Sequence, residues 1–510
     1  MNYRLIVIPL VLMLTACGLG TNQDDAPVGF VYPDSGAAAA LSESEFFSLA
    51  PEKQYSVANK LYGSVYKGVA AKEYFDFSFG VANPKVRSDS RPLLHFRQAI
   101  NSPMEKDYNE ELARIDQQYF IDVNSGNPRW EPAEVPLTYL FELDLSREHF
   151  NYWIAYQLVN NILFSPALEL ESVDVTDVQN VYSRLVFAIS ENVPLREIIY
   201  DHMVSEENWR RFRSPEDNTR EMMEIFLLHF NDEDVPRAAK ACQNWRLSDD
   251  DLGYKLLKST DFNDEAQTLL GSNNIVSCED FMRRIADHPS LIAAVTTRIV
   301  DQMLGNAPQE QRTALVQGIV NAKPTTFVEI YNVLINSRTY LLHAPKTKSV
   351  EETFFNLAGR LSWQPHAGFF DTLTMTYTGN NAATMRKMRQ EAMTYKLGRP
   401  NEVATDTLSF AYYHNLVRDE LLMREKILTR HNGFGWRSTF YEDEDVTALS
   451  NDGFIDYVFI ALLMRKADAV EKAELLALFD ELNLATNRQS QTRMLFDYIS
   501  RLPELYSHSH

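Results

Sequence analysis

The stretch SREHFNYWIAYQLVNNIL, residues 146–163, indicates an α-helical fold. Its large apolar side chains recur at steps of three and four residues, which is the period of an α-helix and not of a strand. They are Phe150, Trp153, Ile154, Leu158, Ile162 and Leu163. We therefore expect a helix that begins near Ser146 and is largely buried.

The same helical period extends on both sides of this stretch. Capping-box spacings, in which Ser or Thr precedes Glu by three residues, occur at 42–45, 326–329 and 349–352. Further periodic segments lie at 382–397, 405–430, 453–466, 468–484 and 488–502. No run of alternating strands and no fixed-length repeat is evident. The sequence therefore predicts an all-α fold with a large multi-helix globular body.

The domain organisation follows from where the helical period stops. It is absent from residues 17–41, which mix Gly, Asp, Pro and Ala and resemble a flexible tether. It stops again between about 363 and 381, where the chain contains Pro, Gly and Thr. We expect a main helical domain at 42–363, and the pattern leaves open a C-terminal helical subdomain at 381–505.

The first residues resemble an export signal. Arg4 precedes ten apolar residues, too few to span a bilayer, which needs roughly 20. The sequence Leu14-Thr15-Ala16-Cys17 then resembles the bacterial lipobox. This resemblance implies that residues 1–16 are removed as a signal peptide and that Cys17 carries lipid chains such as palmitate. An ordinary secreted protein is the alternative.

The resemblance to lipoproteins also implies a location. Gly18, rather than Asp, follows the lipobox Cys, which implies sorting to the outer membrane of the bacterial cell envelope. The lipid on Cys17 would be the contact with the membrane, since no second apolar segment is long enough to span it. The formal net charge of -21 disfavours nucleic acid as a partner.

Two further cysteines, Cys242 and Cys278, are 36 positions apart. In an exported chain they could form a disulfide, whose loop would stabilise the fold by roughly 3 to 4 kcal/mol on the chain-entropy model. Two free, buried thiols are an equal alternative.

The segment NTREMMEIFLLHF, residues 218–230, combines charges with an apolar helix. Asn218 and Glu221 have the spacing of a capping box, and Ser214 followed by Pro215 offers a competing helix start. Glu224 stands among apolar neighbours, so we expect Arg220, four residues earlier, to pair with it.

This segment and those after it resemble a known family. The motifs are Asn218-x-Arg220-Glu221-x-Met223-Glu224-Ile225, Asp232-x-Asp234-Val235, Ala238-Ala239-Lys240-Ala241, Trp245, Leu270-Gly271, FMRRIADHPS at 281–290 and VLINSRTYLLHAPKTKSVEE at 333–352. In this order, over about 195–363, they resemble domain-of-unknown-function family 1800, a group of exported bacterial helical proteins.

The match to the family has three departures. Gln243-Asn244 stands where the family has Thr-Gly, Pro236 interrupts a helix start, and a phrase like the family's opening occurs at 428–437 instead of near the N-terminus. The family carries no established activity. Its members are often encoded beside exported proteins that resemble sulfatases, which implies such a protein as a partner.

Compact catalytic motifs for zinc, nucleotides and serine nucleophiles are missing from the sequence, and it predicts neither a metal nor a cofactor. His229 lies five residues after Glu224, so an i, i+4 metal pair is not available. His288 precedes Pro289 at a helix break. We expect both histidines to be structural, and we keep them with Arg220, Glu224 and Trp245 as functional candidates.

Three functions remain open from the sequence. We expect a lipid-anchored scaffold or binding partner of other exported proteins. The first alternative is a cell-envelope hydrolase in which Glu221 or Glu224 and His229 meet residues of distant helices. The second is a glycan-binding surface lipoprotein, in which aromatic clusters such as those at 369–370 and 412–413 stack on sugars.

Overall fold

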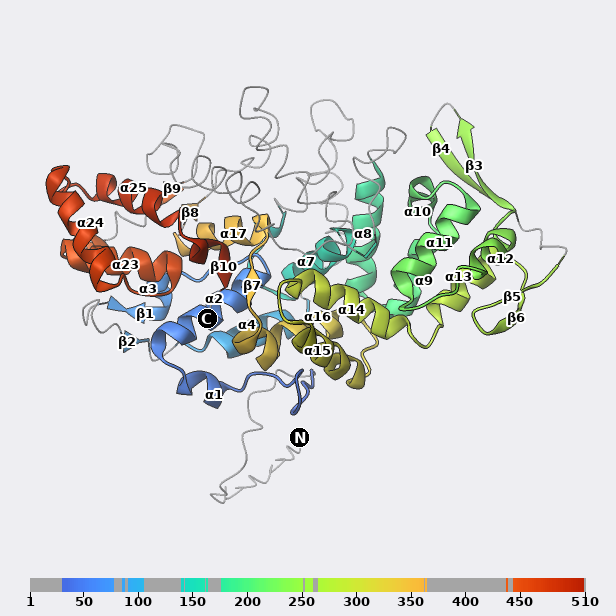
Figure 1. Ribbon diagram of the computed structural model, residues 1–510, viewed down its shortest axis with the longest axis horizontal. Coiled ribbons are helices and arrows are strands. Elements are labelled where there is room, and N and C mark those ends of the chain that lie inside the picture. Colours follow the sequence, from blue (N-terminus) through green and yellow to red (C-terminus); the bar gives the residue numbers. More distant parts are fainter. Residues whose placement is uncertain are drawn as a thin grey trace, which may run out of the picture.

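The structure is a computed structural model of the 510-residue chain. It describes residues 30–77, 85–87, 90–104, 139–141, 143–160, 162–163, 176–250, 253–259, 265–361, 363–364, 437–438 and 444–508. The fold is mostly helical, which confirms the predicted all-α class, and its short strands form two-stranded sheets (Figure 1). Cys17, the break near 363–381 and the segments predicted at 382–397 and 405–430 lie almost wholly outside the described residues.

The helix predicted from residues 146–163 lies at the centre of the molecule. It is α7 (Arg147–Asn160), and the Ser146 hydroxyl accepts a hydrogen bond from the His149 amide at 3.1 Å. Among the described helices, α4 (Pro92–Asn101), α8 (Thr176–Ser190) and α16 (Phe327–Asn336) pack against it. Trp153 meets the ring of Tyr331 edge-on at 5.2 Å, and both are buried. The expectation of a buried helix is confirmed.

The N-terminal elements cover one side of this centre. They are α1 (Glu43–Ser48), α2 (Pro51–Ser64), α3 (Ala71–Tyr74), β1 (Phe75–Asp76) and β2 (Lys85–Val86). The prediction of a tether is wrong for residues 30–41, which pack on α16. Leu41 is fully buried and its amide donates to Asn336 O at 3.1 Å, while the Arg338 amide donates to Ala39 O at 2.7 Å.

A helical lobe with two hairpins forms one end of the molecule (Figure 1). Its helices are α9 (Leu195–Met203), α10 (Glu206–Arg211), α11 (Pro215–Phe226), α12 (Asp234–Ala241) and α13 (Cys278–Ala286). Its antiparallel hairpins are β3 (Trp245–Asp250) with β4 (Gly253–Lys258), and β5 (Gln267–Leu269) with β6 (Ser272–Ile275). The sequence did not predict these strands, because they are short and rich in polar residues.

Four elements lead from this lobe back across the centre. They are α14 (Leu291–Leu304), α15 (Gln309–Asn321), α16 and the π-helical turn η3 (Thr339–His343). Strand β7 (Lys346–Thr347) and α17 (Val350–Arg360) follow. Both capping boxes predicted here, at Thr326–Glu329 and Ser349–Glu352, are confirmed by reciprocal hydrogen bonds.

The C-terminal helices lie at the opposite end from the hairpin lobe (Figure 1). Strand β8 (Trp363–Gln364) pairs with β9 (Arg437–Ser438). The last elements are α22 (Glu444–Thr447), α23 (Asn451–Leu463), α24 (Ala469–Glu481), α25 (Arg488–Ile499), the 3-10 turn η5 (Pro503–Tyr506) and β10 (Ser507–His508). β10 pairs antiparallel with β7, so the end of the described chain returns to the centre.

Two glycines let the chain after α2 lie directly against α17. A Cβ atom built on Gly359 would come within 2.4 Å of the Gly68 Cα, and one built on Gly68 would come within 2.7 Å of the Asn356 carbonyl oxygen. Real Cβ atoms do not approach other atoms so closely. The absence of side chains at these two positions therefore allows α2 and α17 to bring their polar residues together.

Candidate functional site

The helix that contains the 218–230 segment begins earlier than the predicted cap at Asn218. α11 begins at Pro215, and the Ser214 hydroxyl accepts a hydrogen bond from the Asp217 amide at 3.1 Å. The predicted box of Asn218 and Glu221 is therefore wrong, and the competing start at Ser214 is the one used. Asn218 lies inside the helix, fully buried, and neither its amide nitrogen nor its amide oxygen has a hydrogen-bond partner among the described residues.

Glu224 is not the buried, paired carboxylate that the sequence suggested. Its side chain is exposed, and no ion pair joins it to Arg220. The neighbours Met223 and Ile225 are buried, but adjacent helical positions point in directions about 100° apart. The Glu224 backbone carbonyl accepts a hydrogen bond from Arg298 at 2.6 Å. Glu224 therefore contacts α14 through its main chain and not through its carboxylate.

The carboxyl group of Glu221 is perturbed by its surroundings. Partial burial raises its pKa, with the nearby charges of Glu224 and Asp217 acting in the same direction. Arg211 and Arg220 oppose this shift. The group is half-buried at the surface of α11, and among the described residues no histidine or metal-binding cluster accompanies it.

The other sequence candidates are dispersed. His229 is exposed beyond the end of α11. His288 lies in the turn between α13 and α14, where its Nδ1 is 2.7 Å from the Ser290 hydroxyl oxygen, as expected for a structural histidine. Trp245 is buried with its ring centroid 5.4 Å from that of Trp209, and the Lys258 ammonium lies 4.5 Å from the Trp245 ring centre. The structure does not bring these residues together into one site.

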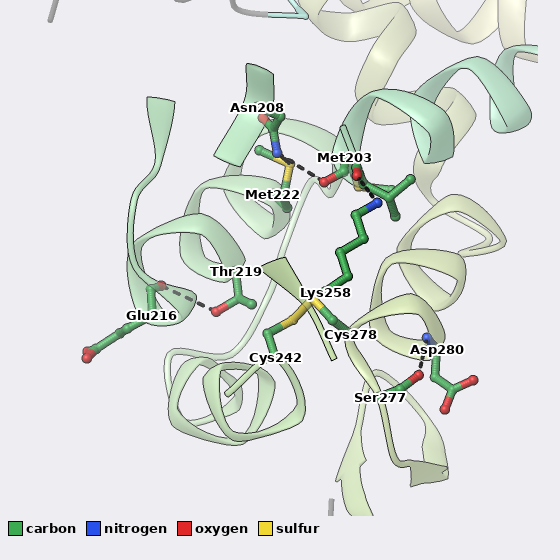
Figure 2. The surroundings of a disulfide bond; sticks show 11 residues. Met203, Asn208, Glu216, Thr219, Met222, Cys242, Lys258, Ser277, Cys278 and Asp280 are labelled. Atoms are coloured by element: carbon green, nitrogen blue, oxygen red, sulfur yellow. Dashed lines mark hydrogen bonds between the residues drawn. A yellow bond between two sulfur atoms is a disulfide. The ribbon is translucent and has the colours of Figure 1, made fainter. Parts of the chain in front are cut away.

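Cys242 and Cys278 form a disulfide, one of the two arrangements that the sequence left open. Figure 2 shows the bond joining the end of α12 to the first residue of α13. Nearby, Lys258 of β4 donates to the Val204 carbonyl at the end of α9 at 2.6 Å. The disulfide and this lysine therefore tie the hairpin region to α9, α12 and α13.

Within the described residues, a group of buried charged side chains lies elsewhere, where β7, β10, α2 and α17 meet. We call it the charged centre. Every side chain in it is at most 1% exposed. Its members are Lys60, Lys346, Lys348, Glu351, Glu352, Arg360 and His508.

An ion pair between Lys346 and Glu352 is the core of the charged centre. The Lys346 Nζ donates to Glu352 Oε1, and both side chains have no solvent exposure. The second carboxylate oxygen of Glu352 accepts from the Ser349 amide at 2.9 Å, which is half of the capping box of α17. The Glu352 carboxylate thus caps the N-terminus of α17 and also neutralises a buried lysine.

Lys348 fastens the end of the described chain. Its Nζ donates to Leu505 O at 2.7 Å, and its amide donates to Tyr506 O at 2.9 Å. Burial, followed by the charge of Arg360, lowers the pKa of the Lys348 ammonium well below its ordinary value of 10.5. The neutral amine is therefore favoured at this position.

Lys60 and Arg360 use their donors to join separate helices. Lys60 Nζ donates to the carbonyls of Tyr340 at 2.5 Å and Ala344 at 2.6 Å. Arg360 donates to Asn59 Oδ1 at 3.0 Å and to Leu462 O at 2.8 Å, which connects α17 with α2 and α23. Burial lowers the pKa of Arg360 to about 10, which leaves it charged at neutral pH.

The charged centre has an excess of cationic groups. Four basic side chains accompany two carboxylates, and the second carboxylate, Glu351, accepts a hydrogen bond from the Tyr156 hydroxyl at 2.8 Å. His508 faces this positive charge. Burial, and then the charges of Lys348, Lys346, Lys60 and Arg360, lower its pKa well below 6.5, so its ring is neutral.

Sequence reasoning did not recognise the charged centre. It used Ser349 and Glu352 as a helix cap and the Lys-x-Lys-Ser segment as a family marker, but lysines are normally among the most exposed residues. The available signal was the position of both lysines directly before a capping box in an apolar segment.

The charged centre contains amines, carboxylates and an imidazole, which are groups that could act as nucleophile or base. Because a substrate would need access to these groups and they are buried, we interpret them as structural. Within the described ranges no group of three His, Cys, Asp or Glu side chains could hold a metal ion.

Comparison of this chain with models of known families, with curated proteins and with solved structures found no match. No helix in the part of the chain that the structure describes is long and apolar enough to cross a membrane.

Replacing Lys346 and Lys348 separately by Met is expected to have unequal effects. Lys346→Met leaves the Glu352 carboxylate buried without a cation and should lower the free energy of unfolding by about 3–5 kcal/mol. Lys348→Met loses a hydrogen bond to the Leu505 carbonyl but leaves no carboxylate without its cation, and should cost about 1–3 kcal/mol. Urea denaturation at pH 7 measures both. An equal or larger loss for Lys348→Met would contradict the assigned ion pair.

The neutral His508 predicts a pH dependence of stability. Because its pKa is lower in the folded than in the unfolded chain, the unfolded state binds the proton first, and stability should fall as the pH drops below about 6.5. His508→Phe keeps a ring but cannot titrate, so its stability should fall less between pH 6.5 and 5. His149 and His202, which titrate in the same direction, are present in both proteins. Identical pH profiles would refute the assignment.

Proposed function

We propose that this chain is an exported, lipid-anchored helical protein of the bacterial cell envelope that acts as a scaffold or binding partner for other exported proteins. The observation that carries the proposal is the burial of the charged centre. The side chains of the charged centre join α2, α17, α23 and the end of the described chain, and none of them is more than 1% exposed. Buried side chains that join helices in this way stabilise a rigid protein body, and they are not placed to react with a substrate.

The disulfide supports the proposed export. Disulfides form and persist in oxidising compartments such as the periplasm and are rare in the cytosol. A Cys242–Cys278 bond is consistent with the export signal proposed for residues 1–16. Lipidation at Cys17 would then hold the body at the outer membrane.

The proposed partner is an exported protein that resembles sulfatases, as the resemblance to domain-of-unknown-function family 1800 implies. The described surface offers such a protein a mixed apolar and acidic stripe on α24 and its C-cap. Val470, Leu478 and the C-cap residue Leu482 are 66%, 40% and 54% exposed, and their spacing places them within one third of the helix circumference. The exposed Glu474 and Glu481 lie on the same side. Exposed apolar side chains beside polar ones are typical of protein interfaces.

The hydrolase alternative has less support. It required Glu221 or Glu224 and His229 to meet residues of distant helices. Glu224 and His229 are exposed, and Glu221 is half-buried beside further acids. The observation in favour of a hydrolase is the raised pKa of Glu221, which suits a general acid.

Lipid anchoring predicts a clear effect of one substitution. The full chain should incorporate a palmitate analogue and sediment with outer membranes, whereas Cys17→Ser should remain unlabelled and be released from them. Cys278→Ser is the matched control, because it also removes a cysteine but should leave the label in place. Labelling of the Cys17→Ser chain would disprove the anchor.

The scaffold proposal predicts a partner that depends on α24. Cross-linking in cells followed by purification of the lipidated chain should recover an exported sulfatase-like protein. Leu482→Asp should reduce its recovery at least tenfold without changing the unfolding midpoint. Leu228→Asp, at a residue 45% exposed in the hairpin lobe, is the control and should leave recovery unchanged. Equal recovery with both variants would exclude α24 as the interface, and recovery of no such protein would overturn the proposed partner.

A further inference from the structure

A polar cleft of about 560 Å³ lies among the ends of four helices near the centre of the molecule. These are the C-terminal ends of α4 and α8 and the N-terminal ends of α7 and α16; α4, α8 and α16 each pack on α7 (Figure 1). The volume is within the range of about 300–1,000 Å³ that is usual for small-molecule sites. The lining residues used below are Phe30, Arg147, Ser190, Asn192, Thr326 and Glu329.

Arg147 supplies the main hydrogen-bond donor of the cleft. Its Nη2 donates to Asn192 Oδ1 at 3.0 Å and its Nη1 donates to Ile100 O at 3.4 Å, so the guanidinium group is held in place by neutral oxygens. Within the described residues no carboxylate forms an ion pair with it. A guanidinium group has five N–H donors, and these bonds leave others available to a ligand.

Asn192 is suited to holding this arginine. Its backbone φ is +54°, a left-handed conformation that Asn adopts more readily than most residues. It directly follows the last turn of α8, and this backbone places its side chain beside Arg147.

Hydroxyl groups supply further donors. The Ser190 hydroxyl oxygen accepts from the Asn151 amide group at 3.1 Å, and the Thr326 hydroxyl oxygen accepts from the Glu329 amide at 3.2 Å. Neither hydroxyl donates its own hydrogen to a described residue. Both can therefore donate to a ligand.

Glu329 supplies an acceptor in the same cleft. Its Oε2 accepts from the Thr326 amide at 3.0 Å as part of the capping box of α16. Its other carboxylate oxygen accepts no hydrogen bond from the described residues, and it can still accept from a ligand.

An aromatic ring borders these polar groups. Phe30 lines the cleft and meets the ring of Tyr32 edge-on at 4.6 Å. Tyr32 is itself fixed, because its hydroxyl donates to Asn332 Oδ1 at 2.7 Å on α16. Phe30 therefore offers an apolar face on a supported segment, next to donors and acceptors.

The mixture of groups discriminates among ligand classes. An anion would be repelled by Glu329, and a cation would be repelled by Arg147. An apolar ligand would cover donors and acceptors without replacing their bonds to water, which is costly. A neutral sugar has hydroxyl groups that both donate and accept, and C–H faces that pack on an aromatic ring.

We propose that the cleft between α4, α7, α8 and α16 binds a short neutral saccharide, with Arg147, Ser190 and Glu329 bonded to its hydroxyl groups and Phe30 against a ring face. This goes beyond the proposed scaffold function, since the cleft is separate from α24 and would bind its ligand with or without a protein partner.

The test is saccharide binding to the full chain. Maltotriose, cellotriose, chitotriose and mannotriose are titrated by saturation-transfer NMR and calorimetry, with sulfate and phosphate as anionic probes. We expect at least one neutral saccharide to bind, and Arg147→Gln to weaken it at least tenfold. Ser190→Ala, a smaller change, should weaken it severalfold and serves as the second variant if Arg147→Gln does not fold.

Arg298→Gln is the matched control. Arg298 also donates to a backbone carbonyl on another helix, at Glu224, and forms no ion pair with a described residue. It lies away from the cleft, so its replacement should leave binding unchanged. The proposal is overturned if none of the four saccharides binds, if both arginine variants bind equally well, or if only sulfate or phosphate binds in a manner that depends on Arg147.

Discussion

The buried ion pair between Lys346 and Glu352 is the constraint on which the centre of the molecule depends. A carboxylate without solvent exposure is strongly unfavourable unless a cation and hydrogen-bond donors surround it. Lys346 lies on β7, which pairs with β10, and Glu352 begins α17, which packs on α2 and α23. The pair can therefore be fully formed only when elements from both ends of the described chain have assembled around it.

The arrangement separates structural chemistry from binding chemistry. The lysines, glutamates and histidine of the charged centre are in the core, where they join helices, and the disulfide Cys242–Cys278 fastens the hairpin lobe at one end. Groups open to a ligand are instead found in the cleft at the ends of α4, α7, α8 and α16. The proposed scaffold function and the proposed saccharide site together account for both sets of observations.

Sequence reasoning was successful where local physics decides the structure. The period of residues 146–163 and the boxes at Thr326–Glu329 and Ser349–Glu352 depend on helix geometry alone. It failed where tertiary packing decides between alternatives. Ser214 and Asn218 were both suitable caps. In the structure Ser214 caps the helix, and Asn218 is buried within it. The exposure of Glu224 and the burial of Lys346 depend on which face of an element meets the core, and the cleft combines residues distant in the sequence.

Native-state hydrogen exchange tests most directly whether the charged centre unites the two ends of the described chain. The amide of Lys348 donates to Tyr506 O at 2.9 Å, so it reports on the attachment of residues 503–508. We expect this amide to open with the same free energy as the amides of α2 and α17, through one cooperative unfolding step. Exchange of the Lys348 amide at a much lower free energy, while α2 and α17 remain protected, would contradict it.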